Sequence, residues 1–161
     1  MSEIVLLPAD QFGNGFVPSE FLPENRDEYY LRDIQANAAA HAWRALSASE
    51  ISILEKNGNT CTDWGKVLVE DPFDVSLVKN SLFAGLVRIG KTSRQYLQYH
   101  DFTVPAGISN SRIIACDIGE NCAIHDCAYM AHYIIGRAYL DRSAERGGRP
   151  LRASLQRDDL R

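Results

Sequence analysis

The sequence of 161 residues has neither a long apolar stretch nor a basic N-terminus that leads into one. Its first apolar run, Ile4–Leu7, is short, ends at Pro8 and follows Glu3, where an export signal would carry positive charge. No stretch approaches the roughly 20 apolar residues that a membrane-spanning helix needs. We therefore expect a cytoplasmic chain with no membrane partner, whose four cysteines are reduced thiols.

Positive charge is scarce as well. The chain carries 17 Lys and Arg against 21 Asp and Glu, a formal net charge of −4. Such a balance argues against an electrostatic nucleic-acid partner. The charge is unevenly spread, because residues 1–136 carry ten basic and seventeen acidic residues, whereas residues 137–161 carry seven Arg, no Lys and four acids.

Two frequent catalytic motifs are also missing from the sequence. There is no Gly-rich loop that could cradle a phosphate and no Ser-centred nucleophile elbow. These absences exclude the commonest nucleotide-hydrolysing and esterase-like signatures. What remains is an ordinary composition, 45% hydrophobic and 24% charged, which suits one domain with a sizeable core.

Two segments precede the repetitive part of the chain. Residues 1–27 contain three prolines and two glycines, and we expect an irregular N-terminal arm. Residues 28–61 are expected to be a helical segment, in which apolar residues at three- and four-residue steps predict a first helix over Tyr30–Ala45. The capping-box pattern Ser47-Ala-Ser-Glu50 predicts the start of a second helix, which should end at Asn57-Gly58.

Apolar residues then recur every five or six positions within residues 62–136. The ladder consists of Ile108, Ile113, Ile118, Ile124, Met130 and Ile135. This step is too long for the alternation within one strand, and it predicts short strands joined by corners, as in a parallel β-helix. A helical interpretation is disfavoured by the β-branched side chains and by three Ile-Gly pairs, which are Ile89-Gly90, Ile118-Gly119 and Ile135-Gly136.

The individual hexads suggest how the interior is filled. Gly119 is expected to permit a tight corner, and the small residues Cys122 and Ala128 are expected to share the interior with the ladder. Residues 91–107 lack the pattern and are expected to form an excursion from one corner.

The chain resembles hexapeptide-repeat proteins of the left-handed parallel β-helix class. More narrowly, it resembles an uncharacterised bacterial family, a domain of unknown function common in Bacteroidetes. The resemblance covers about Tyr29 to Gly136 and rests on the blocks WRALSASEISILEKNGN, DWGKVLVEDPFD, NSLFAGLVRIG, PAGISNSRIIACDIGENCAIHD and YIIG. It implies a mainly β fold with N-terminal helices, and relatives that continue through many more coils.

Residues 137–161 depart from the family pattern, because the hexads stop at Gly136 and an Arg-rich sequence follows. One interpretation is a disordered basic tail that caps the solenoid. The interpretation we favour is a truncated or frame-shifted end that is not native to the fold. In either case the β-helix is short and is expected to depend on the N-terminal helices or on self-association.

Three histidines could carry chemistry. The hexapeptide class implied by the resemblance includes acyltransferases in which a His deprotonates an acceptor hydroxyl or amine. His125 and His132 lie in the ladder region and are the candidate catalytic residues, and His100 could approach from the excursion. A basic cluster near Gly90 could receive a phosphate, although such clusters are more often solvated corners; its members are Arg88, Lys91 and Arg94.

A metal site is a weaker interpretation of the same region. Cys and His are zinc ligands, and they alternate here as Cys116, Cys122, His125, Cys127 and His132. Their spacing matches no zinc knuckle, so we expect buried thiols with surface histidines and no metal. The sequence identifies no cofactor.

Two functions follow from these observations. By analogy of fold, the chain is a transferase that moves an acyl or sugar-nucleotide-linked group to a small metabolite, with a His as general base. The alternative is a non-catalytic scaffold whose β-helix mediates oligomerisation or binds a partner.

Overall fold

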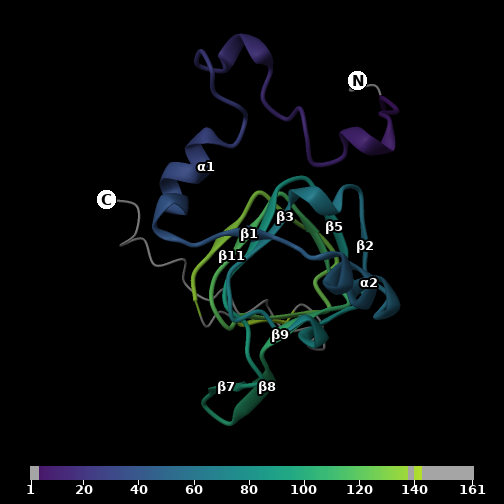
Figure 1. Cartoon of the computed structure of the whole chain (residues 1–161), viewed down its shortest axis with the longest axis vertical. Helices are drawn as coiled ribbons and strands as arrows, with labels where there is room; N and C mark the ends of the chain where they lie inside the picture. The colour runs from purple at the N-terminus through teal and green to yellow at the C-terminus, as the bar shows by residue number, and fades with distance from the viewer. Residues whose placement is uncertain (1–3, 138–139, 143–161) are drawn as a thin grey trace.

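A computed structural model describes residues 4–137 and 140–142 as a mainly β structure (Figure 1). Small parallel sheets enclose a triangular core, and the chain passes from sheet B to sheet A to sheet C four times. Sheet B contains β2 (Thr60–Cys61), β5 (Leu82–Ala84), β10 (Arg112–Ile114) and β13 (Met130–Ala131). Sheet A contains β3 (Val67–Val69), β6 (Val87–Ile89), β11 (Asp117–Ile118) and β14 (Ile134–Ile135). Sheet C contains β4 (Val78–Lys79), β9 (Gly107–Ser109), β12 (Ala123–His125) and β15 (Leu140–Arg142).

The apolar ladder forms the interior, as its spacing predicts. We call one pass through sheets B, A and C a coil, and each sheet a wall. Members of the ladder pair in register with residues of the neighbouring coil, so that apolar residues stack on each wall. The stacks are Phe83, Ile113 and Met130 on sheet B, Ile89, Ile118 and Ile135 on sheet A, and Val78, Ile108 and Ile124 on sheet C. All of these side chains are buried, and each contributes about 1.5–3 kcal/mol by leaving water.

The small interior positions are filled differently from the prediction for one hexad. Cys122 is buried in the core as expected, but Ala128 is exposed and Cys127 lies in the core instead. The reason is an extra residue between the corner and the strand. Met130 follows the corner residue Asp126 by four positions, whereas Ile113 follows Asn110 by three. The small buried residue is therefore the one directly after the corner, Cys127.

The glycine of the Ile-Gly pairs serves close approach of neighbouring coils rather than a left-handed corner. A Cβ on Gly119 would lie 2.6 Å from the Arg137 nitrogen, and one on Gly90 would lie 2.9 Å from the Glu120 nitrogen. Neither glycine has a positive φ, so the expected corner role of Gly119 is wrong.

The corners between sheets C and B are instead turned by polar residues with left-handed backbone. Asn80, Asn110 and Asp126 have φ of 47°, 50° and 57° at equivalent corners of successive coils. Asn80 donates to Asn110 at 2.8 Å, and Asn110 donates to Asp126 at 3.0 Å. Asn and Asp tolerate this conformation best among residues with a side chain, and their stacking ties one coil to the next.

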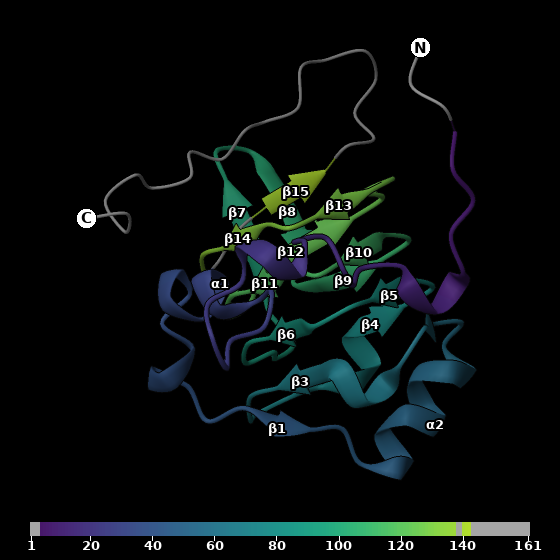
Figure 2. The same cartoon turned by 90° about the horizontal axis from the view of Figure 1, so that it is seen from above.

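The N-terminal elements cover the first coil and one wall (Figures 1 and 2). The capping box at Ser47 is confirmed and begins α2 (Ala48–Lys56), which buries Leu54 against the core. β1 (Arg44–Ala45) pairs antiparallel with β3 at the edge of sheet A. The first helix is shorter than predicted, because α1 (Tyr30–Gln35) ends before Asn37, whose φ of 49° breaks the helix.

Short 3₁₀ turns occupy other parts of the chain. They span Ala9–Gln11, Ser19–Phe21, Ala38–Ala40, Trp64–Lys66 and Val75–Leu77. None of the helices in residues 4–137 and 140–142 is long and apolar enough to cross a membrane.

Part of the segment assigned to the Arg-rich tail carries structure. The backbone of β15 pairs in parallel with β12 and so extends sheet C beyond the last hexad. The remaining tail residues, 138–139 and 143–161, lie outside the described residues. The four domain boundaries that the sequence suggests, including the one at residue 136, stay predictions.

Gly119→Ala is expected to destabilise the protein by about 1–3 kcal/mol, because the new methyl group would overlap the backbone of the next coil. Gly136→Ala is the matched control, since no described atom lies within 4 Å of a Cβ there. Urea unfolding of both variants tests this role. Equal stability of the two variants would contradict it.

Arg44 is expected to stabilise the first coil in a pH-dependent way. Its guanidinium donates to Glu50 at 2.7 Å and to Asp71 at 2.8 Å. The bond to Glu50 lowers the pKa of that carboxyl from 4.5 to about 2, so its contribution is complete above pH 4.5 and is lost as the pH falls through about 2. Arg44→Met should therefore cost about 1 kcal/mol at neutral pH, and the difference from wild type should shrink below pH 4.5. Denaturant titrations from pH 7 downward measure it, and a pH-independent difference would refute the role.

Candidate functional site

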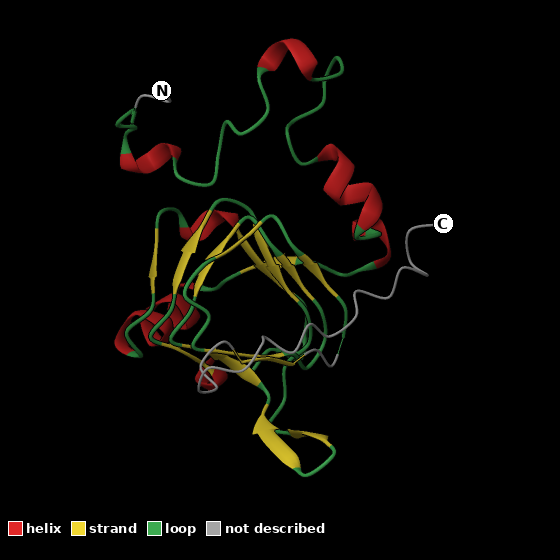
Figure 3. Cartoon of the chain, turned by 180° about the vertical axis from the view of Figure 1, so that it is seen from behind, coloured by secondary structure: helices red, strands yellow, loops and turns green. Residues whose placement is uncertain are grey.

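A β-hairpin projects from the corner between β6 and β9 (Figures 1 and 3). Its strands β7 (Tyr96–Tyr99) and β8 (Phe102–Pro105) pair antiparallel, while the surrounding coils pair in parallel. The hairpin is the excursion predicted for residues 91–107. Its base returns directly into β9 and so stands beside the outer face of sheet C.

A groove runs between the base of this hairpin and sheet C. It consists of two adjoining pockets of about 400 and 460 Å³ that share Ser76, Leu77, Lys79, Pro105 and Ala106. Ser109 and His125 line one end of the groove, and Arg94 and Tyr96 line the other. We call this feature the hairpin groove.

His125 is held at both ring nitrogens. Its Nε2 lies 2.7 Å from the Pro105 carbonyl oxygen, and its Nδ1 lies 2.5 Å from Ser109 Oγ. A carbonyl oxygen can only accept, so Nε2 carries the proton in the neutral ring and donates it to Pro105. Nδ1 is then an acceptor, and the Ser109 hydroxyl donates to it.

The strand register builds this contact. Ser109 pairs with His125 on the next coil and with Lys79 on the previous one, so the three form a column on sheet C. Ser109 and His125 are half-buried, and Lys79 is exposed. The ammonium of Lys79 has no hydrogen bond or ion pair to the described residues, which leaves its positive charge at the groove.

The opposite end of the groove is also charged. Arg94 lies 3.6 Å from Asp74 and 3.4 Å from the Ser76 hydroxyl. Hydrogen bonds from Ser76, and to a lesser degree the charge of Arg94, lower the pKa of Asp74 and keep it ionised. Lys79 therefore carries positive charge in the part of the groove that both pockets share, and Arg94, paired with Asp74, carries it at one end.

The other candidate histidines lie elsewhere. His132 lies at the corner between β13 and β14 with a φ of 61°, and its ring packs against Phe16 of the N-terminal arm in a tilted arrangement, with 4.4 Å between centroids. His100 lies at the tip of the hairpin against Tyr99. The structure thus brings neither of them into the groove with His125.

The structure separates two members of the basic cluster near Gly90, Arg88 and Arg94. Arg88 is buried and makes ion pairs with Asp117 and Asp33, and Arg32 of α1 lies 2.9 Å from the same Asp117 carboxylate. This ion-pair cluster fixes α1 to sheet A. Arg88 is therefore unavailable to an external anion, whereas Arg94 lines the groove.

The cysteines make no metal cluster within the described part of the chain. No group of three or more Cys, His, Asp or Glu residues there is arranged to hold a metal ion. The four cysteines, all among the described residues, form no disulfide, and burial raises the pKa of Cys116 to about 11. Three of them pack in the core as small apolar residues.

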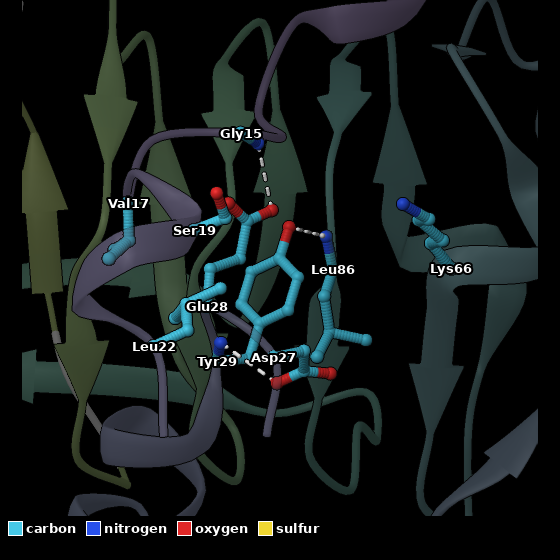
Figure 4. A pocket seen from close by; sticks show the side chains of 9 residues that line it. All are labelled: Gly15, Val17, Ser19, Leu22, Asp27, Glu28, Tyr29, Lys66 and Leu86. Atoms are coloured by element: carbon cyan, nitrogen blue, oxygen red, sulfur yellow. Dashed lines mark hydrogen bonds between the residues drawn. The ribbon is translucent and has the colours of Figure 1, made fainter. Parts of the chain in front are cut away.

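A second pocket, of about 460 Å³, lies between the N-terminal arm and the coils (Figure 4). Its polar groups hold the arm in place. Glu28 accepts the amide hydrogens of Gly15 and Phe16 at 2.9 Å, and the Tyr29 hydroxyl donates to Gly13 and accepts from Leu86. Because these groups are engaged with the backbone, the hairpin groove is the stronger candidate for chemistry.

Ser109, Lys79 and Pro105 are groove residues that the sequence analysis did not single out. Ser109 follows Ile108 in the ladder as His125 follows Ile124, and this shared position is the signal that could have paired them. Nothing in the sequence marks Pro105, because its carbonyl reaches His125 only through the path that β8 takes back into β9.

The neutral ring of His125 is expected to be the Nε2–H tautomer. Long-range ¹H–¹⁵N spectra of the imidazole should show a protonated Nε2 and an unprotonated Nδ1, because only the first faces a carbonyl. Ser109→Ala should shift the Nδ1 resonance and leave Nε2 nearly unchanged. The opposite tautomer would contradict the arrangement.

Comparison with known proteins identifies the family. Residues 43–142 match the family described as a domain of unknown function, DUF4954. An uncharacterised protein of Treponema pallidum (strain Nichols) is 54% identical over 133 residues, which are 83% of this chain and 18% of that protein. The chain thus spans less than a fifth of the length of this relative, and no solved structure matches it. On the extent of the family match, the chain belongs to the DUF4954 family.

Proposed function

We propose that this chain is a left-handed parallel β-helix segment of a transferase that moves an acyl or sugar-nucleotide-linked group to a small metabolite. The hairpin groove binds the donor, and His125 is the general base. Parallel sheets visited in a fixed order and in-register stacks of branched residues support the β-helix. The left-handed sense is supported by Figures 1 and 2, in which the chain turns anticlockwise from sheet B to A to C while receding from the viewer.

The observation that carries the proposal is the pair of ring contacts of His125, Nε2 with the Pro105 carbonyl and Nδ1 with the Ser109 hydroxyl. A general base needs an unprotonated nitrogen directed at a hydroxyl, and a partner that holds the other nitrogen in place. The Pro105 carbonyl supplies the partner, and Nδ1 already accepts from a hydroxyl in the groove. Such a base contributes typically 10²–10⁴-fold to a rate.

Two cationic side chains, Lys79 and Arg94, offer contacts to an anionic donor, beside the carboxylates of Asp126 in the lining and of Asp74, which pairs with Arg94. Acyl-coenzyme A and nucleotide sugars both carry a diphosphate, which Lys79 would bind in the part shared by both pockets and Arg94 at one end. Since the chain covers 18% of its Treponema relative, the proposal concerns the chemistry of this groove, and other parts of longer relatives could supply the acceptor site.

Binding and turnover test the proposal together. Acetyl-coenzyme A or UDP-N-acetylglucosamine at a hundred times its Kd should add about 2.7 kcal/mol to the stability and raise Tm by several degrees. His125→Asn should lower donor consumption with a panel of amino and hydroxyl acceptors by about 10²–10⁴-fold. His132→Asn is the matched control, because that site lies outside the groove and Asn suits its left-handed backbone.

No rise in Tm with either donor would contradict the proposal, and so would turnover that is equal in the two variants. These outcomes would favour the second candidate, a scaffold.

The scaffold candidate rests on exposed apolar side chains of the arm and the hairpin. Ile4 and Leu6 are 91% and 93% exposed, and Tyr96 is 75% exposed. Contiguous exposed apolar residues such as the run Ile4–Leu7 are typical of surfaces that meet another protein. A concentration-dependent oligomer in light scattering, without any shift in Tm by donors, would support this candidate.

A further inference from the structure

We propose that Ser109 is a nucleophile, activated by His125, and that it carries the transferred acyl group as an ester during the reaction. The inference rests on the proposed function in that His125 is the base. It differs in the first acceptor, which is the protein's own hydroxyl rather than the metabolite. The substrate class is an activated acyl donor, a thioester or an activated ester.

The contact between the two side chains has the geometry that activation of a serine requires. Ser109 Oγ lies 2.5 Å from His125 Nδ1, and His125 Nε2 lies 2.7 Å from the Pro105 carbonyl. The nucleophile, the base and a group that orients the base are thus arranged in sequence. The backbone carbonyl of Pro105 takes the orienting place that a carboxylate holds in a catalytic triad.

Neither of two nearby serines has both access to the groove and a hydrogen bond to a histidine. Ser76 also lines the groove, but its hydroxyl donates to the Asp74 carboxylate at 2.6 Å. Ser111, two residues after Ser109, is buried, and its hydroxyl donates to the Ser109 carbonyl at 2.8 Å. Ser109 combines access to the groove with a hydrogen bond to a base.

The step balances without any further reactant. Ser109 Oγ attacks the acyl carbonyl carbon, a C–O bond forms, and the hydroxyl proton passes to His125 Nδ1. The bond from carbon to the thiolate or alkoxide leaving group breaks, and His125 returns the proton to that group. A hydroxyl acceptor, or water, then attacks the ester with His125 again as base, which restores Ser109.

Lys79 supplies the charge that this step needs. The backbone amides of the two corner residues that follow Ser109 and His125 are engaged, because Asn110 donates to the Lys79 carbonyl and Asp126 donates to the Ser109 carbonyl. The ammonium of Lys79 belongs to the residue paired with Ser109 on the previous coil and lines the same groove. It is the group placed to stabilise the oxyanion that develops on the substrate.

Acid-quenched mass spectrometry of the full chain tests the proposal, with p-nitrophenyl acetate as the acyl donor. Wild type should gain one acetyl group, mapped to the peptide that contains Ser109. Ser109→Ala should lose this adduct, and His125→Asn should form it about 100-fold more slowly. Ser93→Ala and His132→Asn are the matched controls, because both sites lie outside the groove, and they should acylate as wild type does.

The outcomes separate the two proposals. Loss of donor turnover in His125→Asn with full turnover in Ser109→Ala and no adduct on Ser109 would overturn the covalent step and leave the general-base role standing. Equal turnover in all variants would overturn both. If Ser109→Ala is unfolded by circular dichroism, the wild-type spectrum decides: an acetyl ester mapped to Ser109 supports the proposal, and its absence refutes it.

Discussion

The stacking of coils in register is the constraint on which the rest of the structure depends. Each inward branched side chain must meet its counterpart one coil away, or the core leaves cavities that cost several kcal/mol. Because side chains alternate along a strand, the residue after each buried ladder residue must face outward. The register that stacks Ile108 on Ile124 therefore also stacks Ser109 on His125 and Lys79 on Ser109.

The hairpin turns this outward column into a site. A column of polar residues on a flat sheet face is exposed to solvent on one side. The chain leaves the second coil after β6 and returns through β8 into β9, so the Pro105 carbonyl stands over His125. One insertion thereby encloses the groove and orients the His125 ring, and Lys79 and Arg94 place positive charge in its lining.

The ladder, the excursion and the capping box of the second helix could be predicted because each depends on local periodicity or on residues three positions apart. The corner residues were missed because Asn80 and Asn110 are ordinary polar residues until their backbone is seen to be left-handed. Gly119 was given the wrong role for a related reason, since only the next coil shows what a Cβ would strike. The ion pairs of Arg88 and the contact of Ser109 with His125 join residues on different strands, and a single sequence shows such pairs only once the register is known.

A disulfide cross-link tests most directly whether the coil register places Ser109 beside His125. Paired residues of adjacent parallel strands lie within the range that a disulfide can span. The double variant Ser109→Cys, His125→Cys should form a cross-link between positions 109 and 125 under mild oxidation, as identified by peptide mapping without reduction. A cross-link that forms instead in the double variant Ser109→Cys, Asp126→Cys would show that the register is shifted by one residue and would contradict the proposed site.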